Sequence, residues 1–419
     1  MERSSIVPGE ALEVLLVGAS DLRGGAARAA YRLHRGLSSR KEVRSRFLVQ
    51  HKDSDDPSVL GPSSPLSRLT SKVRRATGEA LSNLLPGEAS GKRSLNIVPS
   101  GLHRRINALD PDVVHLHWIG HESISIREVR KIEAPIVWTL HDMWAFRGFS
   151  HYLPMNKKGG ENEESAGKIS FSIDRWLRRY KKQQWSDVNM TIVTPSAWLA
   201  QRTRRSEVLG QKRIRQIFNG IDTDTYKPIS TSVARSVFQL PEEVPLVLFG
   251  AINPMGNSRK GGHLLQPALR KLQDHRDDIE LVVFGGADGN LQDQFEATVH
   301  PVGRLQDDCS LALLYSAADV FAIPSMQDNL PNTVVEAMAS GTPCVGFDVG
   351  GIPEMIDHRK NGYVAERFSV EDFAEGLRWV IESEVQSGLR REARAKVQQE
   401  FELDTITQRY LECYRDARK

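Results

Sequence analysis

The chain has 419 residues, more than one ordinary hydrophobic core organises, and its composition of 40% hydrophobic and 26% charged residues is typical of a globular protein. Its 56 lysines and arginines nearly balance 53 aspartates and glutamates, so the net charge of +3 argues against nucleic acid as a partner. Three scattered cysteines argue against a disulfide scaffold or a zinc ribbon, and they fit a reducing compartment.

The N-terminal segment MERSSIVPGEALEVLLVG is charged at its start and lacks the long apolar core of a signal peptide. No stretch of the sequence approaches the ~18 apolar residues that a membrane-spanning helix needs. We therefore expect a cytoplasmic protein, at most peripheral on the inner face of the plasma membrane.

Short apolar runs alternate with helical stretches along the chain, which predicts parallel β-α-β units. Strands are predicted at 13–20, 112–120, 134–142 and 188–196 in the first half, and at 244–252, 279–286, 318–325 and 342–348 in the second. The turn-rich segment 217–228 separates the halves. The pattern predicts an α/β fold of two doubly wound, Rossmann-like domains, 1–225 and 226–400, which face a cleft at the carboxyl ends of their strands.

Gly24 and Gly25 follow the first predicted strand and open a helix in DLRGGAARAAYRL. Glycine lets backbone amides approach an anion closely at the positive end of a helix. A turn that needs positive φ explains the same two glycines, so both interpretations stay open.

Arg259 and Lys260 stand side by side in RKGGHLL, between the first strand of the second domain and the next helix. Two fixed cations beside helix amides form a site for a diphosphate that needs no metal. The alternative is an ordinary solvated basic loop. The strand-to-helix position favours the diphosphate site.

Two carboxylates flank a turn in PSMQDNLPNTVVEAMASGTPC, residues 324–344. Asp328 follows a buried strand, where a doubly wound sheet places its ligand contacts. Asn332 is predicted to cap the next helix, which leaves the amides of the first turn for a phosphate. Glu336 lies about one turn inside that helix, where its carboxylate would repel a phosphate but suits a ribose diol. The alternative is that Glu336 only balances the helix dipole.

Several motifs in this order resemble glycosyltransferase family 4. The segment 318–364, ADVFAIPSMQDNLPNTVVEAMASGTPCVGFDVGGIPEMIDHRKNGYV, resembles the family's signature of two glutamates separated by seven residues, at positions Asp328 and Glu336 here. The stretches GGAARAAYRLHRGL, VVHLHWIG, TLHDMWAF, VTPSAWL and FNGIDTDTYKP extend the resemblance over most of the chain, toward the branch that builds bacterial capsule, O-antigen and exopolysaccharide. The resemblance implies the two-domain GT-B fold, with the C-terminal helix at 401–419 packing back on the first domain.

The resemblance also implies a reaction, in which a retaining hexosyltransferase moves a sugar from a UDP- or GDP-sugar to a glycan or lipid-linked glycan, without a metal or other cofactor. It implies that Glu336 binds the nucleotide ribose and that Asp328 contacts the transferred sugar. It places Lys260 at the diphosphate and His141 near the anomeric carbon of the donor. The catalytic set is then His141, Lys260 and Asp328, and the donor-binding set is Gly24, Gly25, Arg259, Lys260, Asp328, Asn329, Leu330, Asn332, Thr333 and Glu336.

Two departures from the family pattern concern the donor side. Asp328 is one methylene shorter than the family's glutamate, and Ala251 stands after Gly250 where many members carry arginine. We expect Arg259 to substitute for that arginine. The departures keep open a protein of another class, a GT-B binding protein that has lost catalysis, although the presence of His141 and Lys260 argues against it.

A third class is a metal-dependent hydrolase. His115 and His117 lie on one face of a predicted strand, and a His-x-His pair begins the metal site of some hydrolases. Such a site needs further His or Asp ligands at later strand ends, and the predicted strand at 188–196 is followed by none. We interpret both histidines as cleft or packing residues and expect no bound metal.

Two segments stand apart from the alternating pattern. Residues 51–94, rich in Ser, Pro and charge, are predicted as a partly helical excursion from the first domain. The helix predicted at 170–185 combines basic and aromatic residues, which suits peripheral contact with an anionic membrane. The alternative is a surface helix whose aromatic side chains face the core. Its basic residues are Arg175, Arg178, Arg179, Lys181 and Lys182, and its apolar anchors are Trp176, Leu177, Tyr180 and Trp185.

Overall fold

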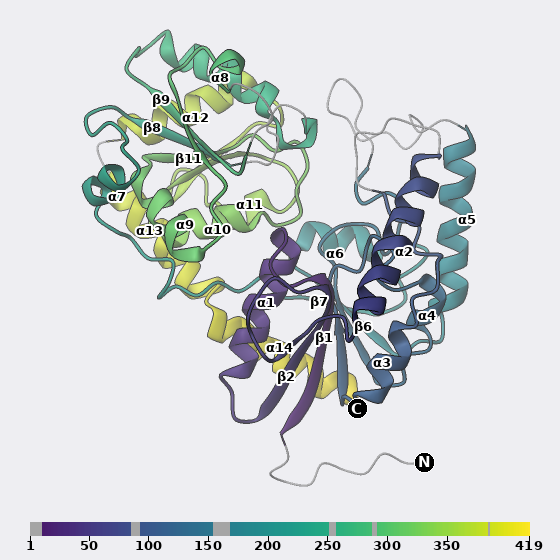
Figure 1. Ribbon diagram of the computed structural model, residues 1–419. Coiled ribbons are helices and arrows are strands. Elements are labelled where there is room, and N and C mark those ends of the chain that lie inside the picture. The colour runs from purple at the N-terminus through teal and green to yellow at the C-terminus, as the bar shows by residue number, and fades with distance from the viewer. Residues whose placement is uncertain (1–10, 85–92, 154–167, 251–256, 287–290, 384–385) are drawn as a thin grey trace. The chain divides into compact units, whose positions relative to one another are not determined.

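The computed structural model divides the chain into two compact units (Figure 1). Unit 1 holds the residues up to Gly220 together with Leu403–Lys419, and unit 2 holds Ile221–Glu402. The predicted domain limits, 225 and 400, differ from these borders by only a few residues. The structure describes residues 11–84, 93–153, 168–250, 257–286, 291–383 and 386–419.

Unit 1 is built on a seven-stranded parallel sheet with strand order β3-β2-β1-β4-β5-β6-β7. Its strands are β1 (Leu12–Ser20), β2 (Val43–His51), β3 (Val59–Leu60), β4 (Val113–Leu116), β5 (Ile136–Thr139), β6 (Met190–Thr194) and β7 (Arg213–Gln216). Its helices are α1 (Gly25–Ser38), α2 (Pro65–Asn83), α3 (Leu102–Ala108), α4 (Ile126–Val129), α5 (Lys168–Trp185), α6 (Ala197–Arg204) and α14 (Leu403–Arg418). The central strands β4, β5 and β6 are buried along their whole length, as parallel strands covered on both faces must be.

The last helix, α14, packs on the sheet of unit 1. The Tyr410 hydroxyl lies 2.9 Å from Thr139 Oγ1, and the Tyr414 hydroxyl lies 2.7 Å from His115 Nδ1. Arg418, near the end of the helix, pairs with Asp112 at 2.9 Å. The C-terminal helix is therefore tied to β4, β5 and the residue before β4.

Unit 2 holds a six-stranded parallel sheet with strand order β10-β9-β8-β11-β12-β13. Its strands are β8 (Leu246–Gly250), β9 (Glu280–Phe284), β10 (Val299–Gly303), β11 (Val320–Ile323), β12 (Cys344–Phe347) and β13 (Gly362–Ala365). Its helices are α7 (Thr231–Val237), α8 (Gly262–Gln273), α9 (Asp308–Ala317), α10 (Asn332–Ala339), α11 (Ile352–Met355), α12 (Val370–Glu382) and α13 (Gln386–Glu400), with short 3-10 turns η2 (Ser258–Lys260) and η3 (Leu291–Gln294). The predicted α/β fold with two doubly wound sheets is confirmed.

Each sheet reverses its strand order beside its first strand. The reversal lies between β1 and β4 in unit 1 and between β8 and β11 in unit 2. Ligands of doubly wound sheets bind outside the carboxyl ends of the strands at such a switch point. A ligand-binding site is therefore expected at the loops after β1, β4, β8 and β11.

The basic and aromatic residues of α5 divide between the core and the surface. Leu177, Lys181 and Trp185 are buried, so Trp185 faces the core, as the alternative of an ordinary surface helix predicts. Trp176 is exposed, and Tyr180 stacks on it with ring centroids 5.6 Å apart. None of the helices in the described part of the chain is both long enough and apolar enough to cross a bilayer.

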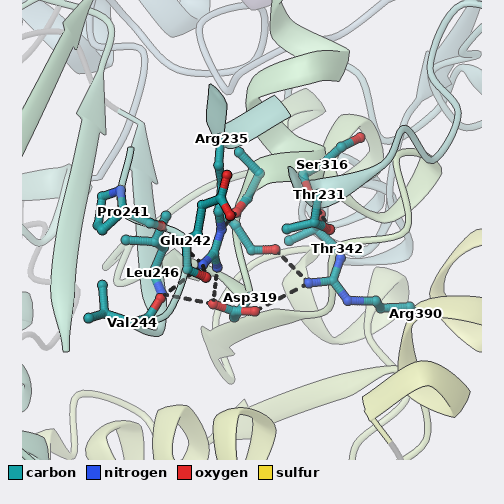
Figure 2. A network of polar contacts seen from close by, with 12 residues as sticks. Thr231, Arg235, Pro241, Glu242, Val244, Leu246, Ser316, Asp319, Thr342 and Arg390 are labelled. Atoms are coloured by element: carbon teal, nitrogen blue, oxygen red, sulfur yellow. Dashed lines mark hydrogen bonds and ion pairs between the residues drawn. The ribbon is translucent and has the colours of Figure 1, made fainter. Parts of the chain in front are cut away.

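A buried charge network ties together the amino-terminal ends of β8 and β11 (Figure 2). The Arg235 guanidinium donates to Asp319 Oδ2 at 2.7 Å and to three backbone carbonyl oxygens of residues 241–244. The same carboxylate oxygen accepts the Leu246 amide at 2.8 Å, and Arg390 lies 3.5 Å from the other one. Because this edge is opposite to the switch-point loops, we assign the network to folding and not to ligand binding.

Replacing Arg235 by methionine should destabilise unit 2 by about 3 to 5 kcal/mol, because the half-buried Asp319 carboxylate and the carbonyl oxygens of residues 241–244 then lose their main partner. Circular dichroism during urea unfolding would show a lower midpoint. Arg378→Met is the matched control, since Arg378 pairs with Glu375 and Glu382 on the surface, where pairs contribute about 1 kcal/mol or less. Equal effects of the two substitutions would contradict a folding role for the network.

Candidate functional site

The two predicted cations lie on the loop that follows β8. Arg259 and Lys260 end the turn η2, and Gly261 joins that turn to α8 with a φ of 72°. A side chain at Gly261 would collide with the carbonyl oxygen of Pro324, just after β11. The glycine therefore lets the loop after β8 lie against the backbone that leaves β11. Ala251, on the same loop, lies outside the described residues.

Asp328 lies after β11, across the switch point from the loop after β8, and it pairs with these two cations. Lys260 Nζ lies 2.7 Å from Asp328 Oδ2, and Arg259 Nη1 lies 3.3 Å from the same oxygen. Arg259 Nη1 also donates to the carbonyl oxygen of Gln327 at 2.7 Å. The structure thus brings Asp328 together with two adjacent cations that lie nearly seventy positions earlier in the sequence.

In this ion pair the side chains of the two cations stay partly exposed to solvent, whereas the carboxylate is almost fully buried. Burial by itself would raise the pKa of Asp328, but the charges of Lys260 and Arg259 outweigh it and hold that pKa below its ordinary value. The side chains of Lys260 and Arg259 are 28% and 23% exposed, whereas that of Asp328 is 10% exposed. Both cations therefore stay partly exposed to an approaching anion.

Gly350 approaches Asp328 from the loop after β12. Its φ is 59°, and a side chain there would collide with the carbonyl oxygen of Asp328. The Gly351 amide donates to that oxygen at 3.2 Å. The sequence shows a glycine turn at 350–356, but it does not show that this turn holds the backbone of Asp328.

The helix α10 begins at Asn332, so the prediction that Asn332 caps it is wrong. Pro331 occupies the cap position, with no side-chain hydrogen bond, because its fixed φ of −66° already directs the chain into the helix. Asn329 and Leu330, just before it, are buried. The amides of Asn332 and Thr333 lie in the first turn, where the helix dipole favours an anion.

Glu336 is buried on the same helix. Its Oε2 accepts a hydrogen bond of 2.9 Å from the Tyr315 hydroxyl, and the Tyr315 carbonyl oxygen accepts one from the Thr342 hydroxyl at 2.6 Å. Tyr315 therefore orients the Glu336 carboxylate. Sequence reasoning missed Tyr315, because the apolar pattern of α9 indicates only a core position and no motif marks the carboxylate that its hydroxyl meets.

In unit 1, Gly24 ends the loop after β1 and Gly25 begins α1. Gly24 occupies the cap position of α1 with a φ of 90°, which favours glycine, and a side chain there would meet no atom within 4 Å. The buried Asp21 fixes the turn by accepting the amides of Asp53 and Ser54 at 3.0 and 2.9 Å. Backbone conformation accounts for Gly24, and close approach to an anion remains a proposal.

Three histidines from the ends of β4 and β5 are in contact. His117 Nδ1 lies 3.1 Å from His141 Nε2, and the rings of His115 and His117 have centroids 4.1 Å apart. Both ring nitrogens of His115 meet hydroxyl groups, those of Tyr414 and Thr139. These contacts pack α14 onto the sheet. Because both ring nitrogens of His115 already have hydroxyl partners, His115 does not suit the role of a metal ligand. Within the described ranges, no group of three or more His, Cys, Asp or Glu side chains is arranged to hold a metal ion.

Burial keeps these three imidazoles neutral. It lowers the pKa of His115 and of His117 well below the usual value, and the neighbouring histidines lower both further. Burial lowers the pKa of His141 to about 4, although the adjacent Asp142 raises it. His141 is therefore a neutral hydrogen-bonding group.

The loop that carries His141 is held by buried polar groups. Asp142 accepts a hydrogen bond of 2.6 Å from His151 Nδ1. Lys181 Nζ, on α5, is buried and donates to three carbonyl oxygens within residues 144–148. Burial lowers the pKa of Lys181 well below its usual value. The sequence does not reveal this role, because Lys181 stands in a basic run that predicts a solvated face.

Two family models match the chain. The model described as Glycosyltransferase Family 4 matches residues 23–225, and the model described as glycosyl transferases group 1 matches residues 245–383. Both halves of the chain therefore resemble glycosyltransferases. The first match covers most of unit 1, and the second covers the loops after β8 and β11 that hold Arg259, Lys260 and Asp328.

The chain also resembles sequence relatives and solved structures. A D-inositol 3-phosphate glycosyltransferase of Saccharomonospora viridis is 29% identical over 217 residues, which are 49% of this chain and only 50% of that relative. Sucrose-phosphate synthase from Thermosynechococcus elongatus has a TM-score of 0.68 at 17% identity and covers 97% of this chain and 98% of its own. Anabaena HepE in complex with UDP-glucose has a TM-score of 0.63 at 18% identity, with coverage of 97% and 100%. These structures show that the chain has the GT-B fold.

The buried histidines predict how stability depends on pH. Their folded pKa values lie below the unfolded value of about 6.5, so their contribution is complete above that pH and is lost as the pH falls below it. His117→Gln removes one such group and should reduce the slope of unfolding free energy between pH 6.5 and 5 by up to about 1.4 kcal/mol per pH unit.

Tryptophan fluorescence during urea unfolding would measure this slope, because six of the seven tryptophans lie in unit 1. His275→Gln, at an exposed position of unit 2, is the matched control and should leave the slope unchanged. A slope that His117→Gln does not alter would contradict the neutral state of His117.

Proposed function

We propose that the chain transfers a sugar from a nucleoside diphosphate sugar to a hydroxyl group of an acceptor, and that unit 2 binds the donor. The observation that carries this proposal is the convergence of Lys260 and Arg259 on Asp328 at the switch point of the glycosyltransferase group 1 domain. Partly exposed cations beside the first turn of a helix suit a diphosphate.

The chemistry of the transfer explains why cations are needed there. Departure of the nucleoside diphosphate builds negative charge on its phosphate oxygens as the bond to the anomeric carbon breaks. Lys260, Arg259 and the first amides of α10 would stabilise that charge in place of a metal ion. Loss of one such group typically costs a hundredfold or more in rate, about 3 kcal/mol of barrier.

The carboxylates would hold hydroxyl groups rather than phosphates. We assign the nucleotide ribose to Glu336, whose carboxylate Tyr315 orients, and the transferred sugar to Asp328. Because Lys260 and Arg259 hold the Asp328 side chain, its position relative to the sugar is set by the cations that hold the diphosphate. This coupling suits a residue one methylene shorter than the glutamate of the family pattern.

We propose a UDP- or GDP-sugar as the donor, which the UDP-glucose in the HepE structure supports by analogy of fold. We propose retention of the anomeric configuration, with the proton of the acceptor passing to the leaving phosphate and neutral His141 contacting the sugar. For the acceptor we propose a glycan or lipid-linked glycan of bacterial polysaccharide synthesis, with no metal required. The exposed Trp176 is the part of α5 that still suits contact with a membrane.

The proposal predicts that one nucleotide class raises the melting temperature of the protein. A ligand at about a hundred times its dissociation constant adds roughly 2.7 kcal/mol, which corresponds to about 5 °C or more for a unit of this size. Thermal melting with UDP, GDP and ADP, and with their sugars, would measure the shift. Glu336→Gln should abolish it by removing the ribose contact.

Glu375→Gln is the matched control, a partly exposed glutamate of the same unit outside the proposed site, and should keep the full shift. A nucleotide shift together with release of free nucleoside diphosphate in the presence of acceptor supports the transferase, whereas a shift without any turnover supports the inactive binding protein. A shift with zinc or manganese but with no nucleotide would contradict the proposal and favour the hydrolase.

A further inference from the structure

The helix α2 turns its apolar side chains away from its own domain. Five of the ten large apolar side chains that are exposed in the described part of the chain lie on this helix or directly after it: Leu66, Leu69, Val73, Leu81 and Leu84. The steps of three, four and eleven residues from Leu66 through Leu69 and Val73 to Leu84 place these four on one stripe, because eleven residues are about three turns. Leu66 is 69% and Leu84 79% exposed.

The opposite face of α2 is the one that packs on unit 1, and it is small and polar. Ser71 and Gly78 are buried, and a side chain at Gly78 would collide with the side chain of Glu122. Ser71 Oγ donates to Gln50 Oε1 at 3.0 Å, and Arg74 Nη2 donates to the same oxygen at 3.1 Å. These contacts fix the rotation of the helix about its axis. The apolar stripe is therefore its outer face.

The sequence gives this helix a defined start. Ser64 accepts the Ser67 amide at 3.1 Å, and the Ser67 hydroxyl accepts the Ser64 amide at 3.0 Å, with Pro65 in the first turn. A capped helix of 19 residues presents the stripe as one continuous surface.

Cations run along one flank of the stripe. Arg68 and Lys72 are exposed between the stripe and the packed face, and Arg75 on the same flank pairs with Glu79 at 2.9 Å. In an antiparallel pair of these helices the basic flank of one copy would meet the basic flank of the other, and this repulsion disfavours such a homodimer. An anionic lipid surface complements the same pattern, since apolar side chains enter the acyl region while cations meet the headgroups.

We propose that the outer face of α2 docks the protein on an anionic lipid surface. This inference does not rest on the proposed transfer reaction, because it concerns residues of unit 1 outside the donor-binding set. It makes α2, rather than the helix predicted at 170–185, the main membrane-binding element.

Flotation with phosphatidylcholine vesicles, with and without phosphatidylglycerol, tests the proposal on the full chain. The protein should bind the vesicles that contain phosphatidylglycerol, and added salt should weaken that binding. The double variant Leu69→Gln, Val73→Gln should lower the partition coefficient at least about tenfold, because both apolar groups are lost. Val233→Gln with Val237→Gln, a pair of exposed valines on α7, is the matched control and should bind like the natural chain.

The melting temperature and its nucleotide shift, both measured without vesicles, check that the variants fold and keep this test separate from the donor site. Arg68→Gln with Lys72→Gln should weaken binding to anionic vesicles about tenfold or more and remove most of its salt dependence. Absence of binding by the natural chain, or binding that Leu69→Gln, Val73→Gln leaves intact, would overturn the proposal. So would a dimer in sedimentation equilibrium that this variant dissociates, because the stripe would then be a contact between copies.

Discussion

The ion pair between Lys260 and Asp328 connects the two loops that leave the switch point of unit 2, and the proposed donor site depends on it. Parallel strands end at one edge of their sheet, so the loops after β8 and β11 start as neighbours. Gly261 and Gly350 then let the backbone lie closer than any side chain would allow, one against the segment after β11 and the other against Asp328 itself. The carboxylate holds both cations in place before any ligand arrives. Preorganised charge of this kind stabilises a leaving group without rearrangement during the reaction.

Unit 1 uses buried polar groups in a different way. Around His141, burial keeps the histidines neutral, and hydroxyl and imidazole partners from β4, β5 and α14 fix their positions. Lys181 holds the loop after β5 by donating to backbone carbonyl oxygens. Each buried donor or acceptor in such a network is costly to leave without a partner. The network therefore fixes the direction of the His141 ring more firmly than packing alone would.

The sequence allowed the fold class to be predicted because apolar runs of strand length alternate with helices, and the two doubly wound sheets followed from that pattern. Strands β2 and β7 escaped prediction, because Arg44, Arg46, Arg213 and Arg215 interrupt their apolar character at alternate positions. Arg259, Lys260 and Asp328 were predicted from their positions after strands. That reasoning works because strand order, and not side-chain detail, brings such loops together.

Features that depend on packing were not predictable in the same way. The hydroxyl of Tyr315 meets Glu336 only because α9 and α10 pack together, and Pro331 replaces Asn332 at the helix cap because backbone geometry decides the cap position. The outward stripe of α2 reverses the usual expectation that the apolar face of a helix points inward. Its direction follows from the packing of Gly78 on Glu122 and the hydrogen bond from Ser71 to Gln50, which the sequence does not show.

The measurement that tests the central claim most directly is a crystal structure of the protein with the nucleoside diphosphate that melting experiments select. Our account predicts the diphosphate within hydrogen-bond distance of Lys260 Nζ, Arg259 and the amides of Asn332 and Thr333, with the ribose hydroxyls on the Glu336 carboxylate. A nucleotide bound elsewhere, or phosphates turned away from Lys260 while Asp328 keeps both cations, would contradict the claim that this ion pair is the donor site.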